Sequence, residues 1–146
     1  ITKDDIERVN ERFFPDYSEN EMKSWLRQRS STFVSIPQWF SEISKVDFVV
    51  GSRIHGCQLG LQAGVPAVCL HIDSRTKELC ETMHIPTVSA REFQQSPSLS
   101  YLVDLVQNWD WQRYDEIRLE LAKQTHEFVL NNSLTPSLHF KRLIEQ

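Results

Sequence analysis

The chain has 146 residues and a net charge of −4 at neutral pH, with 40% hydrophobic and 25% charged residues. That length allows one domain with a proper core, and the composition is typical of a soluble globular protein. The negative charge and the lack of a lysine and arginine cluster argue against nucleic-acid binding. No apolar run approaches the roughly 20 residues of a membrane span, and no leader opens the chain, so we expect a cytoplasmic protein.

Two helices are predicted at the start of the chain. Thr2 with Asp5, and Ser18 with Glu21, have the spacing of capping boxes, and apolar residues follow each pair at helical spacing. The chain begins at Ile1 rather than methionine. We therefore expect it to be a fragment of a longer protein.

Strands and helices then alternate along the chain. Strands are predicted at residues 32–36, 46–50, 66–70 and 86–89, and a helix at residues 37–45. Such alternation favours a parallel sheet with right-handed crossovers. We predict an α/β fold with a Rossmann-like parallel sheet flanked by helices.

The carboxyl-terminal third of the chain has helical patterns only. Residues 98–146 are therefore predicted to be a helical extension of a single α/β domain that spans residues 1–146. The terminal helices either pack across the sheet or reach toward another domain, and the sequence does not choose between these arrangements.

The three cysteines, Cys57, Cys69 and Cys80, lie inside the apolar pattern of predicted strands and helices. They lack C-x-x-C spacing, so we expect reduced core residues. The histidines and cysteines show neither H-E-x-x-H nor paired-cysteine spacing. The sequence therefore predicts no metal site.

The segment from Val46 to Gly56 carries the strongest functional pattern. A predicted buried strand, residues 46–50, ends in a loop that holds Arg53 and His55. In parallel α/β sheets, ligands bind outside the carboxyl ends of strands, near helix N-termini that attract anions. A fixed cation beside a titratable group is suited to binding and protonating a small anion. From Gly56 onward, small residues at helical spacing predict a helix packed closely on the sheet.

The next strand is followed by a second polar segment. Asp73 or Ser74 can cap the following helix, and Arg75 and Lys77 then lie in its first turn. Positive residues in the first turn of a helix are slightly destabilising because they oppose the helix dipole, and a nearby anion would offset this cost. The alternative is structural: Asp73 acts as a helix cap, and the two basic residues form a solvated face.

An ordered set of motifs spans residues 46–89. It consists of a G-x-R-x-H-G loop at Gly51–Gly56, a G-x-P turn at Gly64–Pro66, and an acidic then basic pair in Asp73–Arg75. This set resembles the polysaccharide pyruvyl transferase family. The resemblance implies the carboxyl-terminal, donor-binding domain of a fold like that of GT-B glycosyltransferases, with an amino-terminal domain missing from this chain.

The resemblance also implies a reaction in exopolysaccharide biosynthesis. Phosphoenolpyruvate is the donor substrate, no cofactor is needed, and the pyruvyl group moves onto two hydroxyls of a sugar or glycan as a cyclic ketal. Arg53 would then pair with the phosphate or carboxylate, and His55 would act as acid and base. The implied substrate-binding set comprises Ser52, the backbone amides of Ile54 and Gly56, Asp73, Arg75 and Lys77.

One position departs from the family pattern, because Arg75 stands where a lysine is expected. The charge is kept, but a proton-transfer role becomes doubtful. Two other functions remain open from the residues alone. One is the nucleotide-sugar-binding half of a GT-B-like glycosyltransferase or epimerase, and the other is a non-enzymatic module that binds an anion or a partner protein.

Overall fold

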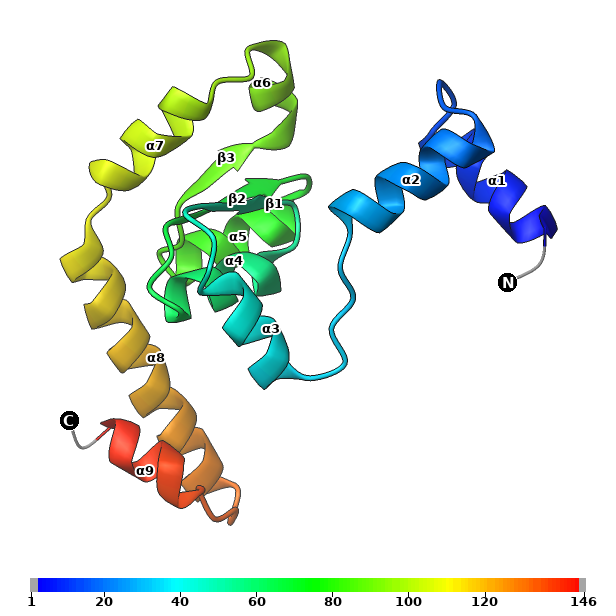
Figure 1. Cartoon of the computed structure of the whole chain (residues 1–146). Coiled ribbons are helices and arrows are strands. Elements are labelled where there is room, and N and C mark those ends of the chain that lie inside the picture. The colour runs from blue at the N-terminus through cyan, green and yellow to red at the C-terminus, as the bar shows by residue number, and fades with distance from the viewer. Residues whose placement is uncertain (1–2, 145–146) are drawn as a thin grey trace. The chain divides into compact units, whose positions relative to one another are not determined.

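The computed structural model describes residues 3–144 and has an α/β fold (Figure 1). Its elements in chain order are α1 (Lys3–Phe13), α2 (Glu19–Arg29), α3 (Ile36–Ile43), β1 (Val49–Gly51), α4 (Ile54–Gln62), β2 (Ala67–His71), α5 (Ser74–Thr82), β3 (Thr87–Ser89), α6 (Ala90–Gln95), α7 (Leu99–Gln107), α8 (Trp111–Asn131) and α9 (Leu138–Ile144). Contacts divide the chain into two compact units, Ile1–Trp39 and Phe40–Gln146. Each unit is described by itself.

The first unit contains α1 and α2, which pack on each other. The predicted capping box at the start of α2 is confirmed: the Ser18 hydroxyl accepts from the Glu21 amide, and the Glu21 carboxylate accepts from the Ser18 amide at 2.8 Å. Hydrogen bonds from Ser18 lower the pKa of Glu21. Thr2, the other predicted cap, lies outside the described residues.

The predicted strand at residues 32–36 is wrong. Val34 is 92% exposed and Ile36 is 69% exposed, and no described strand pairs with this segment. A β-branched sequence forms a strand only where a neighbouring strand and a packed face support it. Ile36 instead begins α3, so the predicted helix at residues 37–45 is confirmed with a slightly earlier start.

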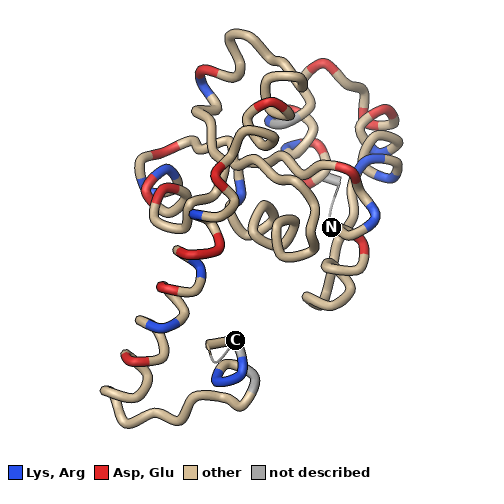
Figure 2. The backbone as a smooth tube through the Cα atoms, turned by 90° about the vertical axis from the view of Figure 1, so that its left-hand side faces the viewer, with Lys and Arg blue, Asp and Glu red and all other residues tan. Residues whose placement is uncertain are grey.

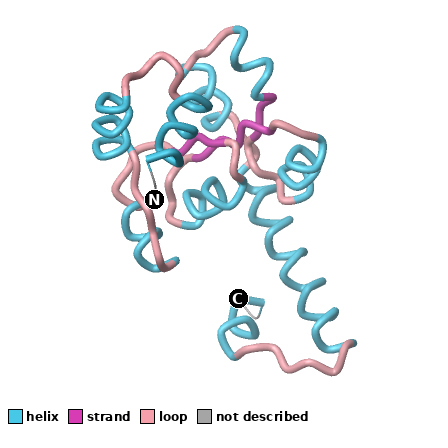
Figure 3. Tube along the Cα trace, turned by 90° about the vertical axis from the view of Figure 1, so that its right-hand side faces the viewer, coloured by secondary structure: helices cyan, strands magenta, loops and turns pink. Residues whose placement is uncertain are grey.

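The sheet lies in the second unit and has three parallel strands in the order β1-β2-β3. Gly51 pairs with Cys69, and Cys69 pairs with Thr87. Within this unit, helices α4, α5, α6 and α7 contact the short strands (Figure 3). The predicted Rossmann-like parallel sheet flanked by helices is therefore confirmed, and the carboxyl ends of all three strands meet at one edge.

Alternating side chains of β2 supply the core on both faces of the sheet. Ala67 and Cys69 pack with residues of α4 and α5, whereas Val68 packs with Leu102 and Val106 of α7. Successive residues of a strand point to opposite faces of the sheet. Because Ala67, Val68 and Cys69 are all buried, helices have to cover both faces. Of the two arrangements left open for the terminal helices, α7 adopts the one across the sheet.

Helix α4 approaches the sheet closely through its small residues, as predicted. A Cβ atom added at Gly60 would lie 3.0 Å from Val49 Cγ2 and 3.4 Å from Ala67 Cβ. Gly64 has a φ of 74°, which ends the segment in a conformation that other residues rarely adopt. The close packing fixes where α4 begins relative to the sheet edge.

The three cysteines are free and fully buried, as predicted. The Cys57 thiol donates to the Val68 carbonyl at 3.4 Å. Its hydrogen bond with Cys69 raises the pKa of the Cys69 thiol to about 11, and the pKa of Cys80 is raised by a hydrogen bond with Cys69 and by burial. The hydrogen bond with Cys69 lowers the pKa of Cys57. With their raised pKa values, Cys69 and Cys80 are protonated core residues at neutral pH.

Strand β1 is less buried than the sequence predicted. Val46 is 46% exposed and Val50 is 47% exposed. The strand was predicted to start at residue 46, but Val46 belongs to the turn after α3, where its amide donates to the Ile43 carbonyl. Strand β1 starts at Val49. As one of the two edge strands of the described sheet, β1 pairs with a neighbour on one side only.

Helix α8 is anchored at its first turn. Trp111 packs against the cluster on the α7 side of the sheet, and Tyr114 packs against the cluster on the α4 side. Charges of both signs then alternate along α8 (Figure 2), and α9 packs on it. Among the described helices, none is long and apolar enough to cross a membrane.

Candidate active site at the carboxyl edge of the sheet

The segment between β1 and α4 places Arg53 and His55 at the sheet edge. Arg53 is the N-cap of α4, with extended backbone angles of −106° and 110°. The sequence placed the helix start near Gly56, but the helix begins at Ile54, whose side chain is only 9% exposed and belongs to the core. His55 therefore lies in the first helical turn rather than in a loop. Both Arg53 and His55 are exposed.

Helix α4 differs from the other described helices in how it begins. Its N-cap, Arg53, makes no side-chain capping hydrogen bond. Serine or aspartate side chains accept such bonds at Ser18, Ser35, Asp73, Ser89, Ser98, Asp110 and Ser137. The N-cap of α1 falls outside the described residues. The start of α4 is thus left without an anionic or hydroxyl acceptor from its own cap.

The backbone amides at the start of α4 have different roles. The Gly56 amide donates to the Arg53 carbonyl at 3.1 Å, so it already has an acceptor. The amides of Ile54 and His55 precede it, and the first amides of a helix have no acceptor within the helix. Together with the helix dipole, such amides attract anions. Neither α4 nor α5 carries an acidic residue in its first turn.

The segment between β2 and α5 supplies its own helix cap. The Asp73 carboxylate accepts from the Thr76 amide at 2.7 Å, which confirms Asp73 as a helix cap. Hydrogen bonds from the Thr76 side chain and amide, followed by the charge of Arg75, hold the pKa of Asp73 below its ordinary value. Lys77, one turn later, pairs with Glu81 at 3.6 Å on an exposed surface.

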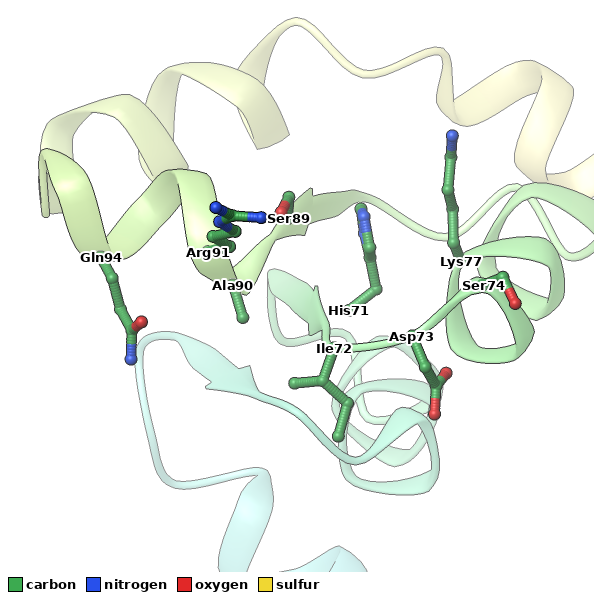
Figure 4. Close-up of a pocket in the computed structure, with 9 residues that line it drawn as sticks. All are labelled: His71, Ile72, Asp73, Ser74, Lys77, Ser89, Ala90, Arg91 and Gln94. Atoms are coloured by element: carbon green, nitrogen blue, oxygen red, sulfur yellow. The ribbon is translucent and has the colours of Figure 1, made fainter.

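A pocket of about 480 Å³ opens where β2 and β3 end (Figure 4). It is lined by His71, Ile72, Asp73, Ser74, Lys77, Ser89, Ala90, Arg91 and Gln94. Of the predicted site residues, it brings together Asp73 and Lys77. The segment of residues 52–56 and Arg75 do not line it.

The sequence reasoning missed Ser89, Arg91 and Gln94 and favoured a structural role for His71. The pairing of His71 with Ser89 puts these two residues side by side at the ends of β2 and β3. A signal was present in the sequence: each of the segments that form β1, β2 and β3 is followed within a few residues by an arginine, and these are Arg53, Arg75 and Arg91. Parallel strands deliver all three to the same edge.

Hydrogen bonds fix the tautomer of His71. The Thr87 hydroxyl donates its single hydrogen to the Cys69 carbonyl at 2.8 Å, and the same oxygen lies 2.9 Å from His71 Nδ1. The hydroxyl therefore accepts from Nδ1–H, which leaves Nε2 of the neutral ring as an acceptor. His71 is both a structural residue, as the sequence favoured, and a lining residue of the pocket. In the described part of the chain, no three His, Cys, Asp or Glu residues gather as a metal site.

Comparison with known proteins decides the family. The family model for polysaccharide pyruvyl transferase matches residues 2–74, half of the chain. The chain belongs to the polysaccharide pyruvyl transferase family. No curated protein and no solved structure matches it. The resemblance seen in the sequence is thus confirmed, and the match includes Arg53 and His55 but ends before Arg75.

Membership in the polysaccharide pyruvyl transferase family indicates a transferase that has a donor and a sugar or glycan acceptor. The matched region ends at Ser74, the first residue of α5. It therefore covers the end of β1, the start of α4 and the end of β2. The end of β3 and Arg91 in α6 lie outside it.

Proposed function

We propose that Arg53 and His55 form the donor site of a pyruvyl transferase. The enzyme would move the pyruvyl group of phosphoenolpyruvate onto two hydroxyls of a sugar and release phosphate. The observation that carries this proposal is the start of α4, where an arginine and a histidine stand at an uncapped helix N-terminus inside the family match. Such a site offers cationic and amide donors to one small anion.

Arg53 is the proposed partner of the donor's phosphate or carboxylate. Its guanidinium has no hydrogen-bond or ion-pair partner among residues 3–144, and its planar fork fits either anion with two parallel hydrogen bonds. The amides of Ile54 and His55 extend this set of donors, and the exposed Ser52 hydroxyl is beside them. The Gly56 amide is not one of the proposed donors, because it already donates to the Arg53 carbonyl.

His55 is the proposed acid and base. Protonation of the methylene carbon of phosphoenolpyruvate makes C2 electrophilic, and a first acceptor hydroxyl adds there while giving up its proton. A second hydroxyl then displaces phosphate at the same carbon, and its proton leaves with the phosphate. The products are a cyclic ketal with a new methyl group and inorganic phosphate. An exposed imidazole beside a fixed cation can give the first proton and take one back.

The residues after β2 support the same anionic donor. Asp73 is committed to the α5 cap, so its proposed role is to orient the segment that carries Arg75 and Lys77. A guanidinium is a fixed cation with donors and no acceptor, so an arginine at position 75 suits anion binding and not proton transfer. By this proposal the chain is the donor-binding half of a GT-B-like enzyme of exopolysaccharide synthesis that acts in the cytoplasm. The acceptor site of that enzyme would also involve a further domain.

Transfer activity of the full-length protein tests the two roles. His55→Gln is expected to lower the turnover number by about a hundredfold or more, the usual effect of losing a general acid and base. Arg53→Gln is expected to weaken the apparent affinity for phosphoenolpyruvate by about tenfold or more, as for the loss of charged hydrogen bonds. Arg142→Gln, an exposed arginine in α9, is the control and should change neither.

Two results would contradict the proposal. Full activity of either Arg53→Gln or His55→Gln would remove the assigned role from that residue. A clear preference for a uridine nucleotide sugar over phosphoenolpyruvate would instead favour a glycosyltransferase or epimerase.

A further inference from the structure

We infer that the pocket between the ends of β2 and β3 is an acceptor subsite that takes a sugar bearing an anionic group, with Arg91 as the partner of that group. This inference rests on the proposed function, because it assigns the second substrate of the same edge. The family match ends at residue 74, so Arg91, Ser89 and Gln94 gain no role from the family comparison.

Arg91 supplies the fixed positive charge of the pocket. It is the second residue of α6, which follows β3, and its guanidinium has no hydrogen-bond or ion-pair partner among the described residues. In Figure 4 it lies beside Ser89, and the side chains of His71 and Lys77 point to one side of the strand ends. The Lys77 ion pair with Glu81 is exposed and long, at 3.6 Å. Such pairs contribute little to stability, so Lys77 remains available to an anion.

The other polar groups of the pocket fit hydroxyls. Because Nδ1–H of His71 is held by the Thr87 hydroxyl, Nε2 is the nitrogen left to bind a ligand, and in the neutral imidazole it is an acceptor. The Ser89 oxygen accepts from the Glu92 amide at 3.4 Å, which leaves its hydrogen to be donated. Gln94 offers both an acceptor and donors. A ligand with hydroxyls and one anionic group satisfies this lining, whereas a bare inorganic anion would leave its neutral members unused.

Asp73 is the one acidic residue of the lining, and it does not cancel the positive charge. Its carboxylate caps α5 through the Thr76 amide and points to the side opposite Lys77 in Figure 4. The lining carries two cations, Lys77 and Arg91, against this single carboxylate. The volume of about 480 Å³ lies within the usual range for small-molecule sites.

The pocket also lies where an acceptor must be. Gly51, the last residue of β1, pairs with Cys69, which is two residues before His71 on the adjacent strand. The pocket and the proposed donor site therefore follow neighbouring strands at the same edge of the sheet. The donor carbon and the acceptor hydroxyls have to meet for transfer, and adjacent strand ends bring the two ligands together.

Binding measurements on the chain test the inference. The probes are a hexose 1-phosphate, a hexuronic acid, the uncharged hexose and phosphoenolpyruvate, each titrated by NMR or calorimetry. The variants are Arg91→Gln, Arg91→Lys and Arg53→Gln, with Arg142→Gln as the control in α9. The phosphate and carboxylate probes show which anion the subsite takes, and Arg91→Lys retains charge without the guanidinium fork.

Arg91→Gln is expected to weaken hexose 1-phosphate or hexuronic acid binding by about tenfold or more, leave phosphoenolpyruvate binding unchanged, and be partly rescued in Arg91→Lys. Arg53→Gln is expected to do the reverse. Anion binding that depends on Arg91 while phosphoenolpyruvate fails to bind would support the subsite and overturn the proposed function alone. Equal affinity for the uncharged hexose, binding of neither anionic sugar, or no effect of Arg91→Gln would overturn the subsite.

Discussion

Helices α4 and α5 both follow a strand of the same parallel sheet, yet they begin in opposite ways. Asp73 caps α5 with its own carboxylate, whereas Arg53 stands at the start of α4 and makes no side-chain cap. Helix N-termini gain stability from acceptors and negative charge. The chain supplies both at α5 and neither at α4. The start of α4 therefore has no acceptor from its own cap, and the proposed donor site rests on this difference.

The largest expected effect concerns the packing that holds α4 in place. Gly60→Val adds atoms where even a Cβ would lie 3.0 Å from Val49 Cγ2, so we expect a loss of about 3 kcal/mol in the free energy of unfolding, as for an overpacked core. Chemical denaturation followed by circular dichroism measures this loss. Because α4 must shift, the position of Arg53 at the edge should be lost as well.

Gly51→Ala is the matched control for that substitution. No atom lies within 4 Å of the Cβ position at Gly51, so stability should change by less than about 0.5 kcal/mol. A loss of stability in Gly51→Ala as large as in Gly60→Val would show that the contacts of Gly60 are not the cause.

A smaller effect is expected from removing the cap of α5. Asp73→Ala should destabilise the chain, and Asp73→Asn, which keeps a capping oxygen, should do so less. The folded chain lowers the pKa of Asp73 below its ordinary value of 3.8. The stability that the charge contributes is therefore present above that value and is lost as the pH falls through the lower folded pKa.

Denaturation of wild type and Asp73→Ala from neutral pH to below 3.8 measures this dependence. The difference in unfolding free energy should be constant near neutrality and shrink at the acid end. A difference that stays the same across the whole range would mean that the charge of Asp73 has no part in capping α5.

The smallest expected effect has the opposite sign. Arg53→Ser gives α4 the kind of cap that the other helices have, so the free energy of unfolding should rise by roughly 0.5–1 kcal/mol. Denaturation midpoints of wild type and variant, with Arg53→Gln as a control that adds no cap, measure the gain. A loss of stability in Arg53→Ser would show that Arg53 already satisfies the start of α4.

The segments after β1 and after β2 also differ in how well their structure was predicted from the sequence. Asp73 and Ser74 were both candidate caps because such side chains before a helical pattern have a local mechanism, and the hydrogen bond from the Thr76 amide identifies Asp73 as the cap. The start of α4 was predicted near Gly56, but the helix begins at Ile54. Ile54 is buried in the core, and this burial depends on tertiary packing that the local sequence pattern does not report. The false strand at residues 32–36 arose because β propensity cannot report the absence of a pairing partner.

The pocket lining could be anticipated only in part. Strand order brings His71 and Ser89 together, and the sequence predicted neither the order nor the register. The role of His71 depends on a hydrogen-bond chain through Thr87 to Cys69, which joins residues 16 and 18 positions apart. No periodic pattern encodes such a chain. The family motif located the β1 and β2 ends because its residues are consecutive along the sequence.

The most direct test of the account is a titration of wild type and Arg53→Ser with phosphoenolpyruvate, followed by NMR. The account predicts saturable binding at the start of α4 in the wild type. In Arg53→Ser, which should be at least as stable, the affinity should fall by about tenfold or more because the guanidinium is lost and the new cap occupies the helix amides. Equal affinity in the two proteins would contradict the claim that the open start of α4 is the donor site.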